Sequence, residues 1–171
     1  MITGTGKRLI WTAMIVVLGS CVCNSFAADE SEELTLSGAL SQVKLFAELT
    51  NAERDALKTA AALRRSTAEE RIIEQGQILD KMFIILEGEG EVWVNGKYLL
   101  TLSGQFLVGE IEFLDTLPAS ADVVLLKETD FIELDNAALI GLMEKQPRMG
   151  YVLMREIAKI EGKRLRDTDS K

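Results

Sequence analysis

The segment from Arg71 to Asp135 breaks into short apolar runs separated by turn residues, and this pattern restricts the fold more than any other feature of the chain. Its clearest point is Asn95-Gly96, which separates the runs VWV and KYLLTL. Both central residues of a two-residue hairpin turn need positive φ, which Asn and Gly tolerate, so we expect residues 92–102 to form one hairpin. The spacing of the other turns favours an antiparallel β-roll over parallel strands joined by crossover helices.

Two helices are expected before the strands. One covers about residues 40–49, and Thr50 with Glu53 then forms a Thr-x-x-Glu capping box, the start signal of a helix that runs to about Leu63. The positions expected to face inward are Phe46, Leu49, Ala56, Leu57 and Ala60.

Two more helices are expected after the strands. Asp135 is typical of an N-cap for a helix through Lys145, which Pro147 would end, and a second helix continues to about Arg166. The fold class expected is therefore mainly β, a jelly-roll-like antiparallel β-roll with flanking N-terminal and C-terminal α-helices. The apolar positions that fall near one face are Leu139, Leu142 and Met143 in the first helix and Met149, Val152, Leu153, Ile157, Ile160 and Leu165 in the second.

The first 28 residues have the layout of an export signal. Lys7 and Arg8 precede a charge-free run from residue 9 to residue 28, which the acidic pair Asp29-Glu30 follows. In this layout the basic pair stays inside, so the domain is expected outside the cytoplasm, in the periplasm or otherwise exported.

Three ways of processing this segment remain open. Residues 25–27 (SFA) suit cleavage by a general signal peptidase, which would leave a mature chain from Ala28. Residues 18–21 (LGSC) resemble a lipobox and would leave Cys21 acylated, as a membrane-anchored lipoprotein. An uncleaved run of about 20 apolar residues can cross a bilayer. Contact with a membrane is expected only through a lipid on Cys21 or through such an anchor.

Cleavage by the general peptidase divides the chain into three parts. Residues 1–27 would be the signal peptide, residues 28–38 an acidic and polar linker, and residues 39–171 one domain. Within that domain the β-roll is expected at about 63–135 and the C-terminal helices at about 136–166. Of the 171 residues, 144 remain after cleavage, which is enough for one core and too few for two.

Composition excludes several classes of function. Both cysteines, Cys21 and Cys23, lie in the signal segment, so the mature domain has no disulfide and no thiolate metal site. The absence of histidine excludes a histidine-based nucleophile relay and histidine metal clusters. Signal removal leaves 17 basic against 27 acidic residues, a net charge of −10, which does not suit nucleic acid. We therefore expect a protein that is not an enzyme and has no cofactor, metal or nucleic-acid partner.

Residues 102–135 carry a recognisable pattern, LSGQFLVGEIEFLDTLPASADVVLLKETDFIELD. It closely resembles the phosphate-binding cassette and the following strands of the cyclic nucleotide-binding domain family. The upstream run LFAELTNAERDALKTAA looks like the helical entry segment of that family. The order and spacing of its glycine-rich turn, aromatic-ended strand and second turn glycine are kept by Gly76, Asp80, Phe83 and Gly88.

The resemblance implies a ligand site with one altered position. In the family, a short helix after Gly-Glu points its free backbone amides at the cyclic phosphate. The glutamate accepts a hydrogen bond from the ribose 2′-hydroxyl, and an arginine pairs with the phosphate. Gly109 and Glu110 match the first two elements, and Ser120 matches a small hydroxyl often found beside the arginine, but Ala119 takes the arginine position. Glu112 stands where the family usually has alanine, close to the phosphate amides. The candidate ligand-binding residues are Gly109, Glu110, Ile111, Glu112, Ala119, Ser120 and Ala121.

Charge near this site is expected to work against a phosphate. Asp122 adds an acid on the strand after the cassette, while Glu110 has a second interpretation as a helix cap. The candidates to replace the missing arginine are Lys127, Lys97 and Arg148, each with a solvated surface charge as the alternative. Losing a buried arginine partner of a ligand phosphate costs on the order of 2 to 5 kcal/mol, so binding of cyclic AMP or cyclic GMP is expected to be weak or absent.

The resemblance also bears on the last helix. In the family it is a lid or dimer helix, so a homodimer through this helix is the alternative to simple cover for the core. In bacterial regulators of this kind a winged helix-turn-helix domain would follow, yet the chain ends at Lys171, so no DNA-binding output domain is expected.

Three functions are consistent with these features. The first is an exported, non-catalytic ligand-binding or regulatory module whose pocket takes a small molecule other than a standard cyclic nucleotide, neutral or cationic in view of the acids. The second is a ligand-free scaffold that binds a protein partner in the cell envelope. The third is a true cyclic nucleotide sensor with a substituted cation.

Overall fold

The hairpin predicted around Asn95-Gly96 is the longest element of the sheet. In the computed structural model, which describes residues 34–169, β3 (Lys81–Val94) and β4 (Lys97–Val108) pair antiparallel along most of their length. Asn95 and Gly96 have φ angles of 51° and 71°, so the predicted turn is confirmed.

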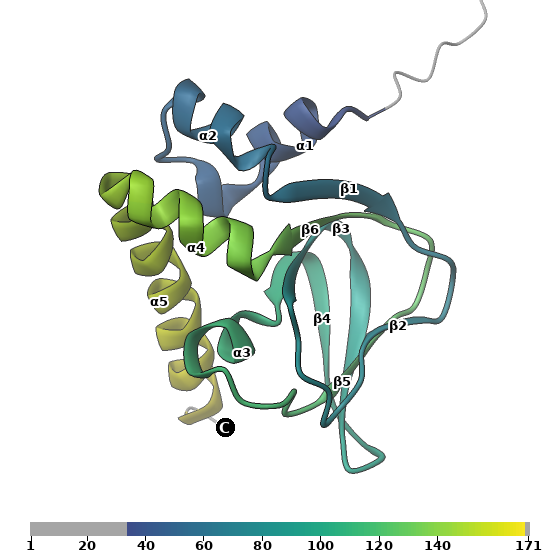
Figure 1. The fold of residues 1–171 in the computed structure, drawn as a ribbon. Helices are drawn as coiled ribbons and strands as arrows, with labels where there is room; N and C mark the ends of the chain where they lie inside the picture. The colour runs from purple at the N-terminus through teal and green to yellow at the C-terminus, as the bar shows by residue number, and fades with distance from the viewer. Residues whose placement is uncertain (1–33, 170–171) are drawn as a thin grey trace, which may run out of the picture. The chain divides into compact units, whose positions relative to one another are not determined.

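The remaining strands pair with β3 or with each other, all antiparallel. The order is β1-β6-β3-β5-β2, with β4 on β3 off this path. Strand β6 pairs with the first part of β3, and β5 pairs with the part near the hairpin turn, so the sheet curls into a roll (Figure 1). The predicted jelly-roll-like β-roll with flanking helices is therefore confirmed. The bounds are β1 (Ala61–Arg65), β2 (Glu70–Ile73), β5 (Asp122–Leu125) and β6 (Asp130–Asp135).

Most helices gather on one side of the roll (Figure 1). They come from both ends of the described chain, and the short helix α3 lies between β4 and β5 in sequence. The bounds are α1 (Leu36–Gln42), the 3-10 helix η1 (Lys44–Phe46), α2 (Asn51–Leu57), α3 (Glu110–Asp115), α4 (Asn136–Lys145) and α5 (Pro147–Asp169).

The entry helices differ from the sequence expectation at three points. Helix α1 already begins at Leu36, within the segment expected to be linker. The single helix expected over 40–49 is broken at Val43, whose backbone is extended with φ −76° and ψ 120°. Helix α2 ends at Leu57 rather than at Leu63, because Ala61 starts β1 and pairs with β6, a tertiary contact that overrides local helix propensity.

The predicted capping signals of α2 and α4 are both confirmed. Thr50 and Glu53 form the reciprocal capping box, and the Asp135 carboxylate accepts the backbone N–H of Ala138 at 2.7 Å. Pro147 does not simply end α4. It is the first residue of α5, a position where its missing N–H costs nothing.

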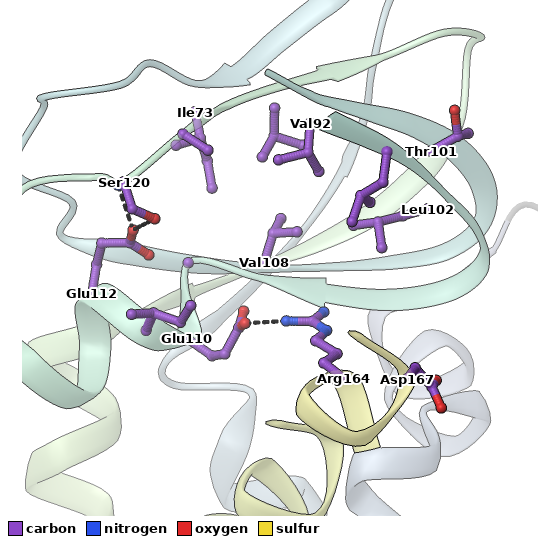
Figure 2. Close-up of a pocket in the computed structure, with 15 residues that line it drawn as sticks. Ile73, Val92, Thr101, Leu102, Val108, Glu110, Glu112, Ser120, Arg164 and Asp167 are labelled. Atoms are coloured by element: carbon purple, nitrogen blue, oxygen red, sulfur yellow. Dashed lines mark hydrogen bonds and ion pairs between the residues drawn. The ribbon is translucent and has the colours of Figure 1, made fainter. Parts of the chain in front are cut away.

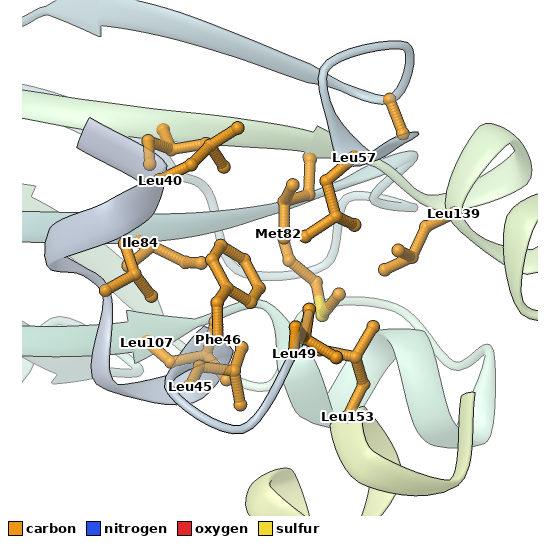
Figure 3. Close-up of a cluster of buried hydrophobic side chains, with 14 of the residues drawn as sticks. Leu40, Leu45, Phe46, Leu49, Leu57, Met82, Ile84, Leu107, Leu139 and Leu153 are labelled. Atoms are coloured by element: carbon orange, nitrogen blue, oxygen red, sulfur yellow. The ribbon is translucent and has the colours of Figure 1, made fainter. Parts of the chain in front are cut away.

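Two apolar clusters hold the fold together. The helix-side core joins the helices to one face of the sheet and includes Phe46, Met82 and Leu153, each at most 2% exposed (Figure 3). The roll core lies between the strands and includes Phe83 and Phe131, whose ring centroids are 6.2 Å apart. The α5 stripe packs into the helix-side core, which confirms its covering role, but Leu165 is 64% exposed and the expectation that it faces inward is wrong.

Nothing between residues 34 and 169 forms a helix long and apolar enough to cross a membrane. The segment expected to be a signal peptide, Cys21 and the start of the expected linker lie outside the described residues.

Candidate functional site

A cavity opens where the start of α3 meets the inner face of the roll. Its volume is about 370 Å³, and we call it the cassette pocket (Figure 2). Strands β2 to β5 supply apolar walls, and α3 and the residues just before β5 supply polar groups. Helix α5 closes one side with Arg164 and Asp167. The other lining residues are Ile73, Val92, Leu100, Thr101, Leu102, Val108, Gly109, Glu110, Ile111, Glu112, Ser120, Ala121 and Val123.

Gly109 sets the direction in which α3 leaves the sheet. It is the N-cap of α3, with φ 82° and ψ 5°, a left-handed conformation that glycine adopts without strain. A Cβ at this position would lie 3.1 Å from the Lys81 carbonyl oxygen. Backbone conformation and close approach therefore both require glycine here, which explains this part of the Gly-Glu motif.

Glu112 turns back into the pocket and binds the chain's own backbone. Its Oε1 accepts the backbone N–H of Ser120 at 3.0 Å and lies 3.4 Å from the Ser120 hydroxyl (Figure 2). The side chain is buried, with the residue only 8% exposed. An amide on the pocket wall that could serve an external anion is therefore already satisfied by an internal carboxylate.

Ala119 does not line the cassette pocket. It is 3% exposed and packs into the roll core. Its N–H donates to the Gln77 carbonyl at 2.7 Å, and its carbonyl accepts the Gly76 N–H at 2.8 Å. Of the seven residues expected in the site, the structure brings six to the pocket and places Ala119 behind its wall.

Glu110 is buried and paired with a residue that the sequence did not suggest. The residue is 2% exposed, and its Oε1 forms an ion pair with Arg164 of α5 (Figure 2). The Arg164 guanidinium also donates to Glu161 at 2.8 Å and to the Leu107 carbonyl at 2.5 Å. No local signal pointed to this pair, because its partners are 54 residues apart.

Burial dominates the ionisation of Glu110. Desolvation raises the pKa of Glu110 to about 7, although the charge of Arg164 acts to lower it. The second carboxyl oxygen, Oε2, is buried without a hydrogen-bond partner in the described part of the chain. The N-cap of α3 is Gly109, and Glu110 lines the pocket and ties α5 to it.

The basic residues proposed from the sequence are engaged elsewhere or absent from the pocket lining. Lys127 lies 3.3 Å from Glu89, and Arg148 pairs with Glu53 at 2.5 Å. Lys97 starts β4 at the hairpin turn and does not line the pocket.

Asp122, the acid expected on the strand after the cassette, does not line the pocket. Its carboxylate accepts the Gln75 N–H at 2.9 Å and lies 3.6 Å from Arg71. Within residues 34–169, no group of three or more acidic, cysteine or histidine side chains could hold a metal ion.

With this geometry established, comparison with known proteins identifies the domain. Residues 63–146 match the family model described as "Cyclic nucleotide-binding domain". This segment belongs to the cyclic nucleotide-binding domain family. The strands, the cassette and α4 all lie within or at the edge of the matched range.

Solved structures agree on the fold. A cyclic nucleotide-binding domain from Methylobacillus flagellatus is 23% identical with a TM-score of 0.66, and the match covers 77% of each chain. The catabolite activator protein of Thermus thermophilus is 23% identical with a TM-score of 0.60, covering 73% of this chain and 59% of that one. The chain thus spans about three fifths of the Thermus protein.

The fold also occurs in a protein that does not depend on cyclic AMP. The regulatory subunit of a cAMP-independent protein kinase A from Trypanosoma brucei is 24% identical with a TM-score of 0.54. The match covers 66% of this chain and 43% of that one.

Proposed function

We propose that the chain is an exported, non-catalytic ligand-binding or regulatory module whose cassette pocket binds cyclic AMP and cyclic GMP weakly or not at all. The observation that carries this proposal is the bond between the Glu112 carboxylate and the Ser120 backbone N–H. It supports a pocket in which an internal anion has replaced an external phosphate. The export part of the proposal rests on the sequence of residues 1–28 alone.

The energetics favour exclusion of a phosphate. A ligand phosphate without its buried arginine partner loses on the order of 2 to 5 kcal/mol, roughly 30- to several-thousand-fold in affinity. Ala119 supplies no charge, and its side chain is buried in the roll core. A phosphate at the Ser120 amide would also have to displace Glu112, and the two negative charges would then lie close together in a partly dry cavity.

The lining of the cassette pocket favours a neutral or cationic ligand. The walls from Ile73, Val92 and Val123 offer apolar contact. The buried Oε2 of Glu110 has no hydrogen-bond partner among the described residues, so a ligand N–H or O–H that reaches it would satisfy a costly unpaired acceptor.

Each alternative function has one observation in its favour. A cyclic nucleotide sensor with a substituted cation gains support from Arg164, which lines the pocket, but Glu110, Glu161 and the Leu107 carbonyl already engage its guanidinium. A ligand-free scaffold for an envelope protein, or a homodimer through α5, gains support from Tyr151, which is 65% exposed on that helix.

The proposal is tested by calorimetric titration of the purified chain with cyclic AMP and cyclic GMP to about millimolar ligand, where binding is worth only about 4 kcal/mol. We expect no transition at micromolar ligand in the wild type. Replacing Glu112 with alanine frees the Ser120 amide and should strengthen any residual binding of the phosphate ligand.

Glu144→Ala is the matched control, because it removes an exposed acid on α4 that does not line the pocket. A micromolar midpoint in the wild type would refute the proposal and support the sensor alternative. Equal binding by Glu112→Ala and Glu144→Ala would show that Glu112 does not guard the amide.

A further inference from the structure

A second cavity lies on the other side of Arg164, between η1, β4 and α5. Its volume is about 390 Å³, within the usual range of roughly 300–1,000 Å³ for small-molecule sites, and we call it the core cavity. Leu102, Arg164 and Asp167 line both cavities and so form a shared wall. Neither the cassette nor the family match accounts for the core cavity, because its η1 and α5 walls lie outside residues 63–146.

The floor of the core cavity is apolar. It is made by members of the helix-side core, of which Val43 and Ile84 are each 2% exposed and Leu45 is 7% exposed. Figure 3 shows Leu45 and Ile84 within this cluster, and Ile160 of α5 adds a further apolar wall. A ligand that fills this floor must carry an apolar body.

The exposed lining residues are mostly basic. Lys44 of η1 and Lys163 of α5 are exposed, and neither forms an ion pair within residues 34–169. Asp167 is the acid that lines this cavity, against these two lysines, so the mouth has a positive balance in a chain of net charge −8 without counting Arg164, which pairs with Glu110 and Glu161. A local positive mouth on an acidic protein attracts an anionic head group.

We infer that the core cavity binds a soluble amphipathic anion, a single carboxylate or phosphate monoester on an unbranched apolar chain. The head group pairs with Lys44 and Lys163 at the mouth, and the chain lies along the floor beside Leu45 and Ile84. The ligand inferred for the core cavity is anionic, whereas the one proposed for the cassette pocket is neutral or cationic. Each inference can therefore be refuted without the other.

Methyl NMR of the purified chain, titrated with sodium decanoate below its micelle concentration, locates the ligand. We expect shifts at Leu45, Ile84 and Ile160, which line only the core cavity, and none at Ile73 and Ile111, which line only the cassette pocket. Decyltrimethylammonium has the same chain with a positive head and should bind at least about tenfold more weakly. Shifts confined to the cassette pocket, equal binding of both compounds, or no shift at all would each overturn the inference.

Paired lysine variants test the head-group contacts. The double substitution Lys44→Gln with Lys163→Gln should weaken decanoate binding about tenfold, because two partly exposed ion pairs are lost. The control is Lys97→Gln with Lys145→Gln, which changes the net charge equally at exposed lysines outside both cavities. An equal loss in both double variants, or no loss in the first, would contradict the assignment.

Discussion

The cassette pocket and the core cavity have nearly the same volume, about 370 and 390 Å³, but opposite charge at their polar ends. Glu110 and Glu112 face the first, whereas Lys44 and Lys163 stand at the mouth of the second. Arg164 belongs to the wall of both. The contrast shows that one wall, formed by Leu102, Arg164 and Asp167, can separate two cavities whose other charged side chains differ in sign.

The largest expected effect comes from removing the shared wall. Arg164→Met should lower the free energy of unfolding by about 3 kcal/mol at pH 8, because it leaves the buried Glu110 carboxylate without its partner. Urea denaturation measures the loss, and Arg166→Met is the control, since Arg166 is exposed and lines neither cavity. Adding Glu110→Gln to Arg164→Met should recover most of the stability. Strictly additive losses would show that the pair is not coupled.

The cassette side of the comparison is tested at Gly109. Gly109→Ala should lower the free energy of unfolding by about 2 to 3 kcal/mol. The new Cβ would lie too close to the Lys81 carbonyl oxygen, and alanine would be strained in the left-handed conformation. Gly104→Ala is the matched control: its φ is 75°, but a Cβ there meets nothing within 4 Å, so we expect about 1 kcal/mol. Equal losses in thermal or urea unfolding would mean that the close approach of the backbone does not matter.

The charge state of the cassette pocket should appear as a pH dependence. The folded-state pKa of Glu110, about 7, lies above its ordinary value of 4.5, so the folded protein holds the proton more tightly than the unfolded chain. The stability that this provides is fully present below about pH 4.5 and is lost as the pH rises through 7.

The comparison protein for this measurement is Glu110→Gln, which cannot titrate at this position. From pH 5 to pH 8 the wild type should lose about 2 kcal/mol relative to Glu110→Gln. Parallel stability curves for the two proteins would show that Arg164 keeps the carboxyl ionised throughout and that burial does not dominate.

The smallest effect is expected at the edge of the core cavity. Gln105 accepts the Lys44 N–H at 2.7 Å and donates to the Gln42 carbonyl at 3.1 Å, which fixes η1 over β4. Gln105→Ala should therefore cost about 1 kcal/mol and shift the Leu45 methyl signals. Gln77→Ala, which removes a surface contact with Glu74, should stay within about 0.5 kcal/mol of the wild type. An unchanged Leu45 environment in Gln105→Ala would show that η1 is held by packing alone.

Much of the fold could be predicted because its signals are local. Asn95-Gly96 sets a turn, Thr50 caps a helix through bonds within four residues, and Asp135 does the same for α4. The end of α2 could not be predicted in this way, since Ala61 pairs with β6 across most of the domain. Strand pairing of this kind depends on the assembled sheet.

In the site, too, the local contact could be predicted and the long-range contact could not. Glu112 and Ser120 are eight residues apart, and the cassette pattern already placed Glu112 close to the amides it binds. Arg164 belongs to α5, whose apolar pattern predicted core packing and gave no sign of a polar contact. Its contact with Glu110 forms only when α5 packs against the roll. Ala119 was expected in the pocket because the family pattern gives its place in sequence but not the direction of its side chain.

The bond between Glu112 and Ser120 has a consequence for selectivity. A carboxylate that belongs to the same chain competes for the amide at a fixed effective concentration, whatever the amount of protein or solute present. Under the proposed function, an external anion that enters the cassette pocket must first displace this tethered carboxylate from the Ser120 amide. On this proposal Glu112 acts as a competitive inhibitor built into the cassette pocket, and a single substitution that removes it would ease the binding of any anion at the Ser120 amide.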